Sequence, residues 1–195
     1  MDLTPQLLLA AYCQGIFPMA HEDGEIYWYD PQPRAIIPLN GFHMPRSLAR
    51  TVKKRPFTIR ANHDFEGVIR ACADPGRGLT WISEQIVTAY IELHRLGFAH
   101  SVEAWQNGRL VGGLYGVAVG GLFAGESMFH HERDASKVAL VHLVRTLRRG
   151  GFRLLDIQFM TDHLAQFGAI EIPRALYKSR LRHALQVEAR FEEAG

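Results

Sequence analysis

Two short stretches place polar side chains where a strand of a sheet would be expected to be apolar. In Leu122–Phe129, LFAGESMF, a single carboxylate, Glu126, stands between Gly125 and an apolar pair. A charge on a half-buried strand costs free energy unless it has partners. The stretch LLDIQF adds a second acid, Asp156, and an amide, Gln158, two residues apart, so both share one face of a strand. These three polar residues are the candidates for chemistry.

The chemistry that these side chains suit is the attack of an amine on an activated carbonyl. An amine is cationic at neutral pH and must lose a proton before it attacks. Carboxylates bind the cation and can then accept or relay the proton, and an amide can orient a carboxylate. Because a helix between two strands forms a crossover to a parallel neighbour, we expect Glu126, Asp156 and Gln158 to converge. The alternative for a lone strand acid such as Asp156 is that it caps or bridges a neighbouring element.

A basic segment lies between residues 44 and 60, MPRSLARTVKKRPFTIR, and contains no acid. Charge runs of this kind usually form a solvated helix face. A phosphate-binding face is the functional alternative, and the absence of acids in a chain that is nearly balanced overall favours it. The candidate phosphate-binding residues are Arg46, Arg50, Lys53, Lys54 and Arg55.

Composition places the chain among globular proteins with a real core: 195 residues, 47% hydrophobic, 22% charged, with a net charge of +2. Cys13 and Cys72 are far apart and form no CxxC pair, so we expect a reducing, cytoplasmic setting rather than a disulfide scaffold. No apolar run is long enough to span a membrane. The stretch MDLTPQLLLAAYCQGIF is predicted to be a helix rather than a lipoprotein signal, because Asp2 replaces the basic residues of a signal and bulky Tyr12 precedes the cysteine.

Cap and turn signals predict the order of elements. Thr4 is expected to cap the first helix and Gly15 to stop it. Asn107-Gly108 between two strand-like runs predicts a hairpin, and Asp134 is expected to cap the helix that follows the third strand. The other predicted strands are Glu25–Tyr29, Ala35–Ile37, Phe57–Ala61, Leu122–Phe129 and Phe152–Met160; the other predicted helices are Asp64–Ala73, Ser83–Leu96, Ala135–Arg149 and one after Pro173.

This order predicts an α+β fold, a mixed sheet with helices packed on it. We expect a small N-terminal α/β domain, residues 1–50, followed by a larger α+β domain, residues 51–195.

Eight motifs are spread over nearly the whole chain: GIFPM (15–19), DPQPRAIIPL (30–39), TWI (80–82), VGGLYGV (111–117), LFAGESMF (122–129), ASKVAL (135–140), LLDIQF (154–159) and HLAQFGAIEIPR (163–174). With these motifs the chain closely resembles the bacterial leucyl/phenylalanyl-tRNA–protein transferase family. The motifs are highly specific together, and the resemblance depends on none of them alone.

The resemblance implies an aminoacyltransferase that moves Leu or Phe, and less readily Met, from aminoacyl-tRNA to the α-amine of a protein that begins with Arg or Lys. The product would be marked for N-degron proteolysis. The larger domain is expected to have a GNAT-like (acetyltransferase-like) fold, with no cofactor and no metal. Glu126, Asp156 and Gln158 match the family's proposed catalytic residues, and in that proposal the last two draw the proton from the acceptor amine. An aminoacyl ester is already activated, so effective positioning alone can supply on the order of 7–11 kcal/mol.

The resemblance also implies how the donor is bound. The amino-acid pocket should be apolar, and a flexible Met in it could accept both Leu and Phe. Trp81 and Tyr90 are expected to stack on or flank the terminal adenosine, although each alone would more often be ordinary core. The basic segment becomes the docking surface for the tRNA acceptor stem. The aminoacyl- and adenosine-binding residues implied are Trp81, Tyr90, Leu114, Phe123, Gly125, Met128, Leu140 and Leu155.

Three rival functions fit the sequence less well. An acyl-CoA-dependent acetyltransferase needs a glycine-rich turn for the pyrophosphate, but the helix after the third strand opens with HHERDASK, which carries acids. A non-catalytic RNA-binding module would leave the three polar strand residues without a function. A metal enzyme is least expected, because His130 and His131 are adjacent and neither HExxH nor CxxC occurs.

Overall fold

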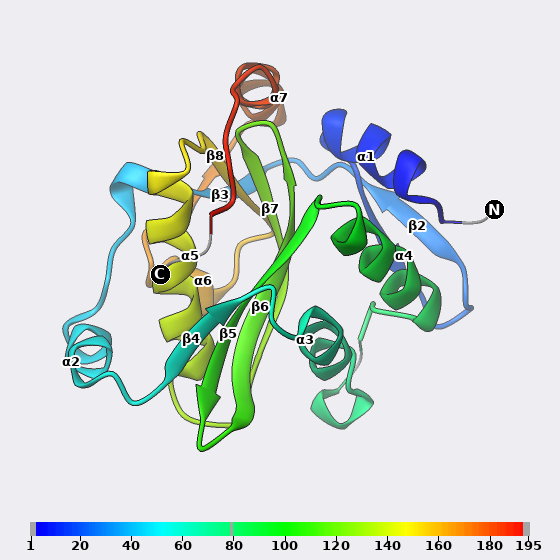
Figure 1. Ribbon diagram of the computed structural model, residues 1–195. Helices are drawn as coiled ribbons and strands as arrows, with labels where there is room; N and C mark the ends of the chain where they lie inside the picture. The colour runs from blue at the N-terminus through cyan, green and yellow to red at the C-terminus, as the bar shows by residue number, and fades with distance from the viewer. Residues whose placement is uncertain (1–2, 79, 193–195) are drawn as a thin grey trace.

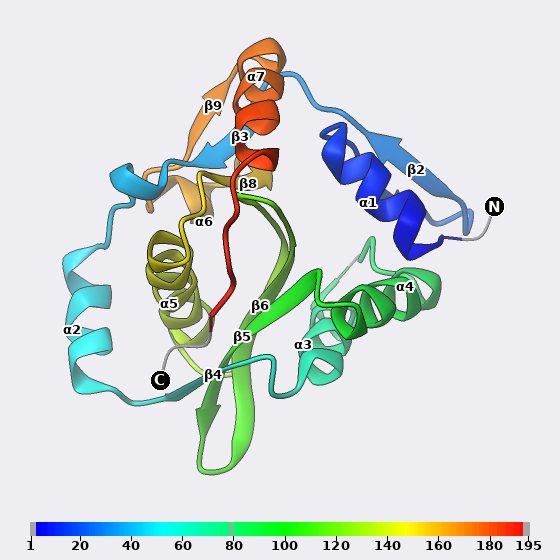
Figure 2. The same ribbon diagram turned by 45° about the horizontal axis from the view of Figure 1, so that its top comes forward.

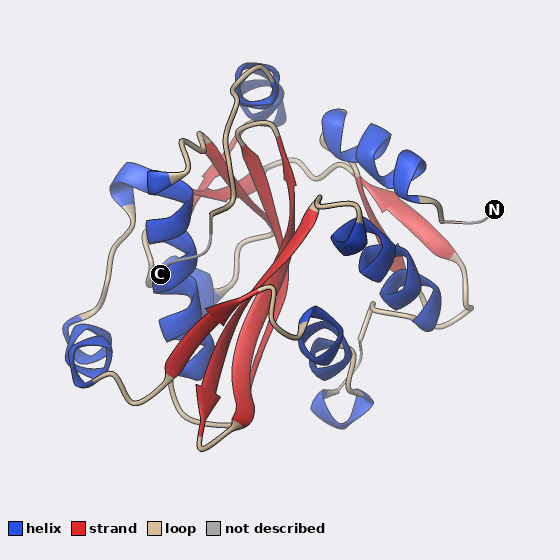
Figure 3. Ribbon diagram, viewed as in Figure 1, coloured by secondary structure: helices blue, strands red, loops and turns tan. Residues whose placement is uncertain are grey.

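The computed structural model describes residues 3–78 and 80–192, which form a mixed sheet with helices on both faces (Figures 1 and 3). Within that part of the chain, seven strands run in the order β4-β5-β6-β7-β8-β3-β9. Neighbouring strands are antiparallel except β7 and β8, which are parallel and joined through α5. The strands are β3 (Arg34–Ile37), β4 (Thr58–Ala61), β5 (Ala99–Gln106), β6 (Arg109–Val119), β7 (Leu122–His130), β8 (Leu154–Gln158) and β9 (Ile170–Ile172). The predicted α+β class is confirmed.

The helices lie where the cap signals predict them, but one of the predicted side-chain caps is absent. The Thr4 hydroxyl accepts the backbone N–H of Leu7 at 3.2 Å, and the Ser83 hydroxyl accepts that of Ile86 at 3.4 Å. Asp134 precedes α5 but its side chain makes no cap bond, so the predicted cap is wrong; the carboxylate pairs with a lysine one turn later instead. The helices are α1 (Pro5–Cys13), α2 (Arg46–Lys54), α3 (Phe65–Cys72), α4 (Glu84–Arg95), α5 (Ala135–Arg149), α6 (Asp162–Ala165) and α7 (Arg174–Leu185).

Two apolar cores separate the helices into layers. On one face of the sheet, α3 and α4 pack with α1 around Phe65, Ile86 and Phe129. On the other face, α5 packs on β5, β6 and β7, and α2 packs against α5. In Figures 1 and 2 these layers lie on opposite sides of the sheet, with α2 at the outer left.

The hairpin between β5 and β6 has the predicted turn. Asn107 and Gly108 both have positive φ angles, 52° and 73°. A two-residue turn with this backbone matches the twist of the strands that it joins, and an Asn-Gly pair adopts it at low cost.

A separate two-stranded hairpin, β1 (Phe17–Ala20) and β2 (Ile26–Tyr29), lies beside α1 and outside the main sheet (Figure 2). The next strand, β3, belongs to the main sheet, where it lies between β8 and β9. The chain therefore enters the larger sheet at Arg34, while a domain division at residue 50 stays a prediction.

No helix within the described ranges has both the length and the apolar character needed to cross a bilayer.

Candidate active site

A pocket of about 320 Å³ opens where β7 and β8 separate. The two strands pair only between Leu122–Ala124 and Leu154–Asp156. Beyond that point β7 continues to His130, whereas β8 ends at Gln158. The gap between the diverging strands gives a ligand access to side chains from both faces of the sheet.

The pocket has an apolar half and an aromatic half. Residues of the α5-side core, among them Leu114, Met128 and Leu155, line the first half. Phe17 and Trp81, which pack with the α1 and α4 side, line the second. The polar side chains of β7 and β8 stand where the two halves meet.

A β-bulge directs Glu126 into this pocket. Tyr115 of β6 pairs with Ser127, and Gly116 pairs with Gly125, so Glu126 has no partner residue on β6. A bulge of this kind bends the strand and re-aims a side chain, and bulges are common next to active sites. The acid is therefore an inserted strand residue, which explains how a carboxylate can interrupt an apolar strand.

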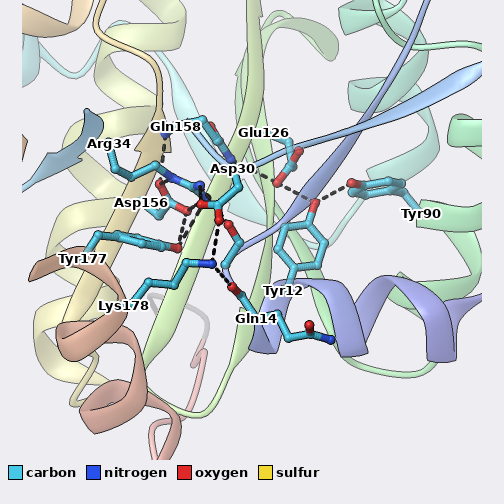
Figure 4. Close-up of polar contacts among 11 residues, drawn as sticks. Tyr12, Gln14, Asp30, Arg34, Tyr90, Glu126, Asp156, Gln158, Tyr177 and Lys178 are labelled. Atoms are coloured by element: carbon cyan, nitrogen blue, oxygen red, sulfur yellow. Dashed lines mark hydrogen bonds and ion pairs between the residues drawn. The ribbon is translucent and has the colours of Figure 1, made fainter. Parts of the chain in front are cut away.

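The carboxyl group of Glu126 is held by hydrogen bonds (Figure 4), and its pKa is high. The Tyr12 hydroxyl donates to its Oε1 at 2.7 Å, and Nε2 of Gln158 donates to the same oxygen at 3.3 Å. Burial above all, with a contribution from the charge of Asp156, raises the pKa of Glu126 to about 8, although the bond from Tyr12 opposes both. That value lies close to the pKa of an α-amino group, about 7.7–8.0. Proton exchange between Glu126 and an amine would therefore be nearly isoenergetic.

Asp156 is buried more completely than Glu126, but its charge is matched. Arg34 donates from Nε to Oδ1 at 2.9 Å and from Nη2 to Oδ2 at 2.6 Å. The Tyr177 hydroxyl donates to Oδ2 at 2.8 Å, and the backbone N–H of Gln158 donates to Oδ1 at 2.9 Å. Each carboxylate oxygen thus accepts two hydrogen bonds, which uses the lone pairs that a substrate proton would need.

Gln158 occupies a constrained position between the two acids. Its φ is 59°, in the left-handed region, and Ala35 pairs with Gln158 while Ile36 pairs with Asp156, so β8 ends in a second bulge. The bond from its N–H to Asp156 fixes this backbone, in the manner of an Asx turn. The side chain donates to Glu126 through Nε2, and its Oε1 makes no hydrogen bond with any other described residue. That oxygen is free to accept an N–H of an amine.

The N-terminal segment is tied to the site through Arg34 and α7 (Figure 4). Nη1 of Arg34 donates to the carbonyl of Gly15 at 2.9 Å, and its guanidinium lies 4.3 Å from the ring centre of Tyr177. Lys178 pairs with Asp30 at 2.8 Å. The strand that begins at Arg34 therefore links the end of α1 to the end of β8.

Most of the residues predicted to bind substrate meet in the pocket. Its lining includes Trp81, Leu114, Gly125, Glu126, Met128, Leu140, Leu155 and Gln158. Three predicted residues do not line it. Asp156 is held behind it by Arg34, Phe123 is fully buried against Phe191, and Tyr90 is fully buried with its hydroxyl hydrogen-bonded to Tyr12. Direct contact between a substrate and Phe123 or Tyr90 gains no support from these positions.

Sequence reasoning missed the partners of the two acids. Arg34 carried a usable signal, since it opens an apolar strand, and an arginine there must be paired if it is buried. Tyr12 and Tyr177 carried none, because each looks like an ordinary core residue of an amphipathic helix. Met19 and Phe159 of the pocket were also missed, because the elements that bring them there are far apart in the sequence.

The predicted tRNA-binding residues lie on α2 and just after it, on the outer side of α5 (Figure 1). Their side chains are exposed, and none forms an ion pair with any residue that the structure describes. A groove of about 600 Å³ between α2 and α5 is lined by Lys53, Arg55, His142 and Arg145 and by no acid. This groove is therefore positively charged, whereas the groove on the other side of α2, lined by Arg50 and Lys54, also contains Glu132 and Asp134.

Among residues 3–78 and 80–192, His, Cys, Asp and Glu side chains do not gather into a group of three that could hold a metal ion.

Comparison with known proteins identifies the family. The family model described as "Leucyl/phenylalanyl-tRNA protein transferase" matches residues 36–182, and the model of that family's N-terminal domain matches residues 1–32. The leucyl/phenylalanyl-tRNA–protein transferase of Herpetosiphon aurantiacus is 60% identical over 190 residues, which cover 97% of this chain and 98% of the relative. That of Paramagnetospirillum magneticum is 57% identical over 194 residues, covering 97% of this chain and 93% of the relative.

A solved structure of L-PGS from Bacillus licheniformis matches with a TM-score of 0.44 and 16% identity over 82% of this chain and 61% of that one, too remote to bear on the site. The two family models together account for most of the described sequence, and the curated relatives match it almost from end to end. The chain belongs to the leucyl/phenylalanyl-tRNA–protein transferase family of aminoacyltransferases.

Proposed function

We propose that this protein transfers Leu or Phe, and less readily Met, from aminoacyl-tRNA to the α-amine of proteins that begin with Arg or Lys. One observation carries the proposal: an apolar pocket ends at a half-buried carboxyl group, Glu126, whose pKa of about 8 suits exchange of a proton with an amine. The product would enter N-degron proteolysis. A cytoplasmic location follows, because aminoacyl-tRNA is made there.

The apolar half of the pocket is the proposed site for the amino acid of the donor. Leu114, Met128, Leu140 and Leu155 offer it hydrocarbon and a thioether. A Leu, Phe or Met side chain gains by leaving water there, whereas a polar side chain would lose its hydrogen bonds. Met128 can change rotamer to fit either a branched chain or a ring.

Glu126 is the proposed proton acceptor. The α-ammonium of the acceptor protein gives one proton to the carboxylate, and the freed nitrogen lone pair attacks the ester carbonyl carbon. A C–N bond forms and the ester C–O bond breaks. The second proton of the nitrogen goes to the leaving ribose oxygen, which becomes a hydroxyl group, and Glu126 returns its proton to solvent. No other reactant is required.

Asp156 is proposed to be a scaffold rather than a base. Two bonds from Arg34, one from Tyr177 and one from the N–H of Gln158 already occupy its oxygens. Its effect on the reaction passes through Gln158, whose backbone it fixes. Gln158 then orients Glu126 through Nε2 and can hold the attacking amine through Oε1.

The tRNA is proposed to dock on the basic side. Trp81 lines the aromatic half of the pocket, where the terminal adenosine would stack. The exposed cations Arg46, Arg50, Lys53, Lys54 and Arg55 would contact phosphates of the acceptor stem.

A transfer assay tests the function. Purified protein is mixed with Leu-tRNA that carries labelled leucine and with one of two peptides, identical except that they begin with Arg or with Ala. We expect label to reach only the Arg peptide, and aspartyl-tRNA to donate to neither. Label in both peptides would overturn the acceptor rule. Binding of tRNA without transfer to either peptide would reduce the protein to an RNA-binding module.

A further inference from the structure

The segment that follows α7, residues 186–192, runs back beside α5 and along the main sheet (Figures 1 and 2). Near its start, Val187 packs so closely on Gly121 that a Cβ added to this glycine would lie 3.1 Å from the Cβ of Val187. Further along, the N–H of Arg190 donates to the carbonyl of Gly150 at 3.0 Å. The segment is therefore fixed at two separate turns, one after β6 and one after α5.

Gly150 is needed for this approach and not for its backbone angle. Its φ is −74°, which any residue can adopt. A Cβ at this position would, however, collide with the carbonyl oxygen of Arg190. A glycine allows the two backbones to touch here, so the course of the segment is built into the end of α5.

The segment ends its course by placing one aromatic ring, Phe191, on the core beside α5. The half-buried ring of Phe191 stacks on His100 at 4.3 Å and on Phe123 at 5.7 Å, measured between ring centres. Burial, with a smaller contribution from His94, lowers the pKa of His100 to about 4. The imidazole is therefore neutral at physiological pH and offers Phe191 an uncharged surface.

Phe123 is confined by its neighbours on the sheet as well as by Phe191. Its ring lies over Gly116 of β6, where an added Cβ would be 2.5 Å from its Cε1. The ring of Phe152 meets it edge-on at 6.3 Å. Because core side chains have little free volume around them, a ring held in this way keeps one position only while each neighbour is present.

Phe123 forms a layer directly behind the amino-acid pocket. It pairs with Leu155 across β7 and β8, one residue before the point where the two strands separate. It shares one apolar cluster with Leu114, Leu140 and Leu155. These three leucines line the pocket, whereas Phe123 does not. The ring therefore backs the closed, apolar end of the pocket.

We propose that Phe191 is a specificity-determining positioning residue for the donor: it holds the ring of Phe123 in place, and that ring limits how deep a side chain the amino-acid pocket accepts. This inference rests on the proposed function and adds to it a residue that adjusts the choice between Leu and Phe without touching either.

The direction of the effect follows from the packing. Without the ring of Phe191, Phe123 can turn into the vacated space, and the closed end of the pocket recedes. A benzyl side chain reaches deeper than an isobutyl side chain, so the deeper pocket favours Phe. A difference of about one methylene in a hydrophobic pocket changes discrimination about tenfold or more.

Two variants remove this support in different ways. Phe191→Ala deletes the ring, while Gly150→Ala displaces the segment and leaves Phe191 itself unaltered. Phe191→Tyr keeps the ring and is the conservative control. Ile69→Ala, which removes buried hydrocarbon from the core on the other face of the sheet, is the control for a general loss of stability.

The readout is the ratio of kcat/KM values for one tRNA charged with Phe and the same tRNA charged with Leu. We expect Phe191→Ala and Gly150→Ala to raise this ratio about tenfold. The change should lie in the KM for the donor, since the side chain of the amino acid is bound equally before and during the reaction. Phe191→Tyr and Ile69→Ala should keep the ratio of the unaltered protein. An unchanged ratio in Phe191→Ala and Gly150→Ala, even with a lower kcat for both donors, overturns the proposal.

A binding measurement separates this proposal from the proposed reaction. The probes are leucyl- and phenylalanyl-adenosine in which an amide replaces the ester, and their Kd values are measured by calorimetry on the same four variants. If the protein transfers no amino acid but Phe191→Ala shifts the ratio of Kd values toward Phe, the reaction fails while the role of Phe191 stands. If transfer occurs and neither ratio changes in Phe191→Ala, only the role of Phe191 fails. If the unaltered protein binds neither probe and transfers nothing, both are overturned.

Discussion

Two consecutive stretches of the chain have opposite charge. Residues 1–33 contain five acids and no Lys or Arg, whereas residues 34–60 contain seven Lys or Arg and no acid. The first stretch forms α1 and the β1–β2 hairpin, and the second contains β3 and α2. Figure 1 places the hairpin and α2 on opposite sides of the sheet. Because these opposite charges largely cancel, the net charge of +2 does not reveal the division.

The division suits an enzyme with two substrates of opposite charge. A tRNA is a polyanion, and the proposed acceptor begins with a cation. If both docked on one surface they would compete for the same charges, whereas a basic side and an acidic side steer each to its own approach. The pocket between the diverging strands is where the two approaches would meet, with Glu126 and Gln158 at the junction.

The largest expected effect is at that junction. Glu126→Gln keeps the shape of the side chain but removes the proton acceptor, so kcat should fall about 10²- to 10⁴-fold. The fall should be the same for Leu and Phe donors and for Arg and Lys acceptors, because Glu126 would serve both sides. Single-turnover transfer measures it, with the exposed Glu132→Gln as control. A fall in kcat with only one of the acceptors would mean that Glu126 recognises the acceptor and does not serve both substrates.

The next largest effect is on stability, at the residue where the two stretches join. Arg34→Met would leave the buried Asp156 without its cation, at a cost of about 3–5 kcal/mol in the free energy of unfolding. Urea denaturation measures the cost. In the double variant Arg34→Met/Asp156→Leu much of the loss should be recovered, because no unpaired buried charge remains. A double variant as unstable as the two losses added together would show that the pair is not coupled.

An effect of similar size is expected in the pH dependence of stability. The pKa of Glu126 is about 8 in the folded protein, against 4.5 for an ordinary glutamate. Between these values the folded state holds a proton that the unfolded state has lost, so the free energy of unfolding falls as pH rises through this window. Below the window the group has no effect on stability, and above it the full loss remains. Glu126→Gln should remove the decline. The stability of the unaltered protein relative to this variant, from melting at pH about 5 and about 9, should fall by roughly 4 kcal/mol with rising pH.

An unchanged difference between those two pH values would mean that Glu126 ionises normally. The proposed proton transfer would then lose its physical basis even if the variant were inactive, because a carboxylate with an ordinary pKa is a poor match for an α-amine.

Local signals in the sequence predicted the elements of the fold well. Thr4, Ser83 and the Asn107-Gly108 turn each act through neighbours within a few residues, so their effect can be read without the tertiary structure. Asp134 shows the limit, since its carboxylate pairs with Lys137 instead of capping α5. The place of β3 in the main sheet was also hidden, because its partners β8 and β9 lie more than a hundred residues away.

The site was predictable in its composition and not in its geometry. Residue types singled out Glu126, Asp156 and Gln158, and the resemblance to the family added most of the pocket. The two acids nevertheless differ, since one faces the pocket with a raised pKa and the other is saturated by Arg34. That difference comes from two β-bulges and a distant arginine, none of which has a periodic pattern in the sequence.

The smallest expected effect compares the two charged sides directly. Arg50→Gln with Lys53→Gln should raise the KM for aminoacyl-tRNA about tenfold at low salt and leave the peptide KM unchanged. Because each lost phosphate contact removes its share of counterion release, the slope of log KM against log salt should fall by about 2. The control is Arg180→Gln with Arg182→Gln, which removes two exposed cations from α7 instead. If both double variants raise the KM for aminoacyl-tRNA equally, the tRNA responds to the total charge of the protein and not to α2. The proposal of a separate basic side for the donor would then fail.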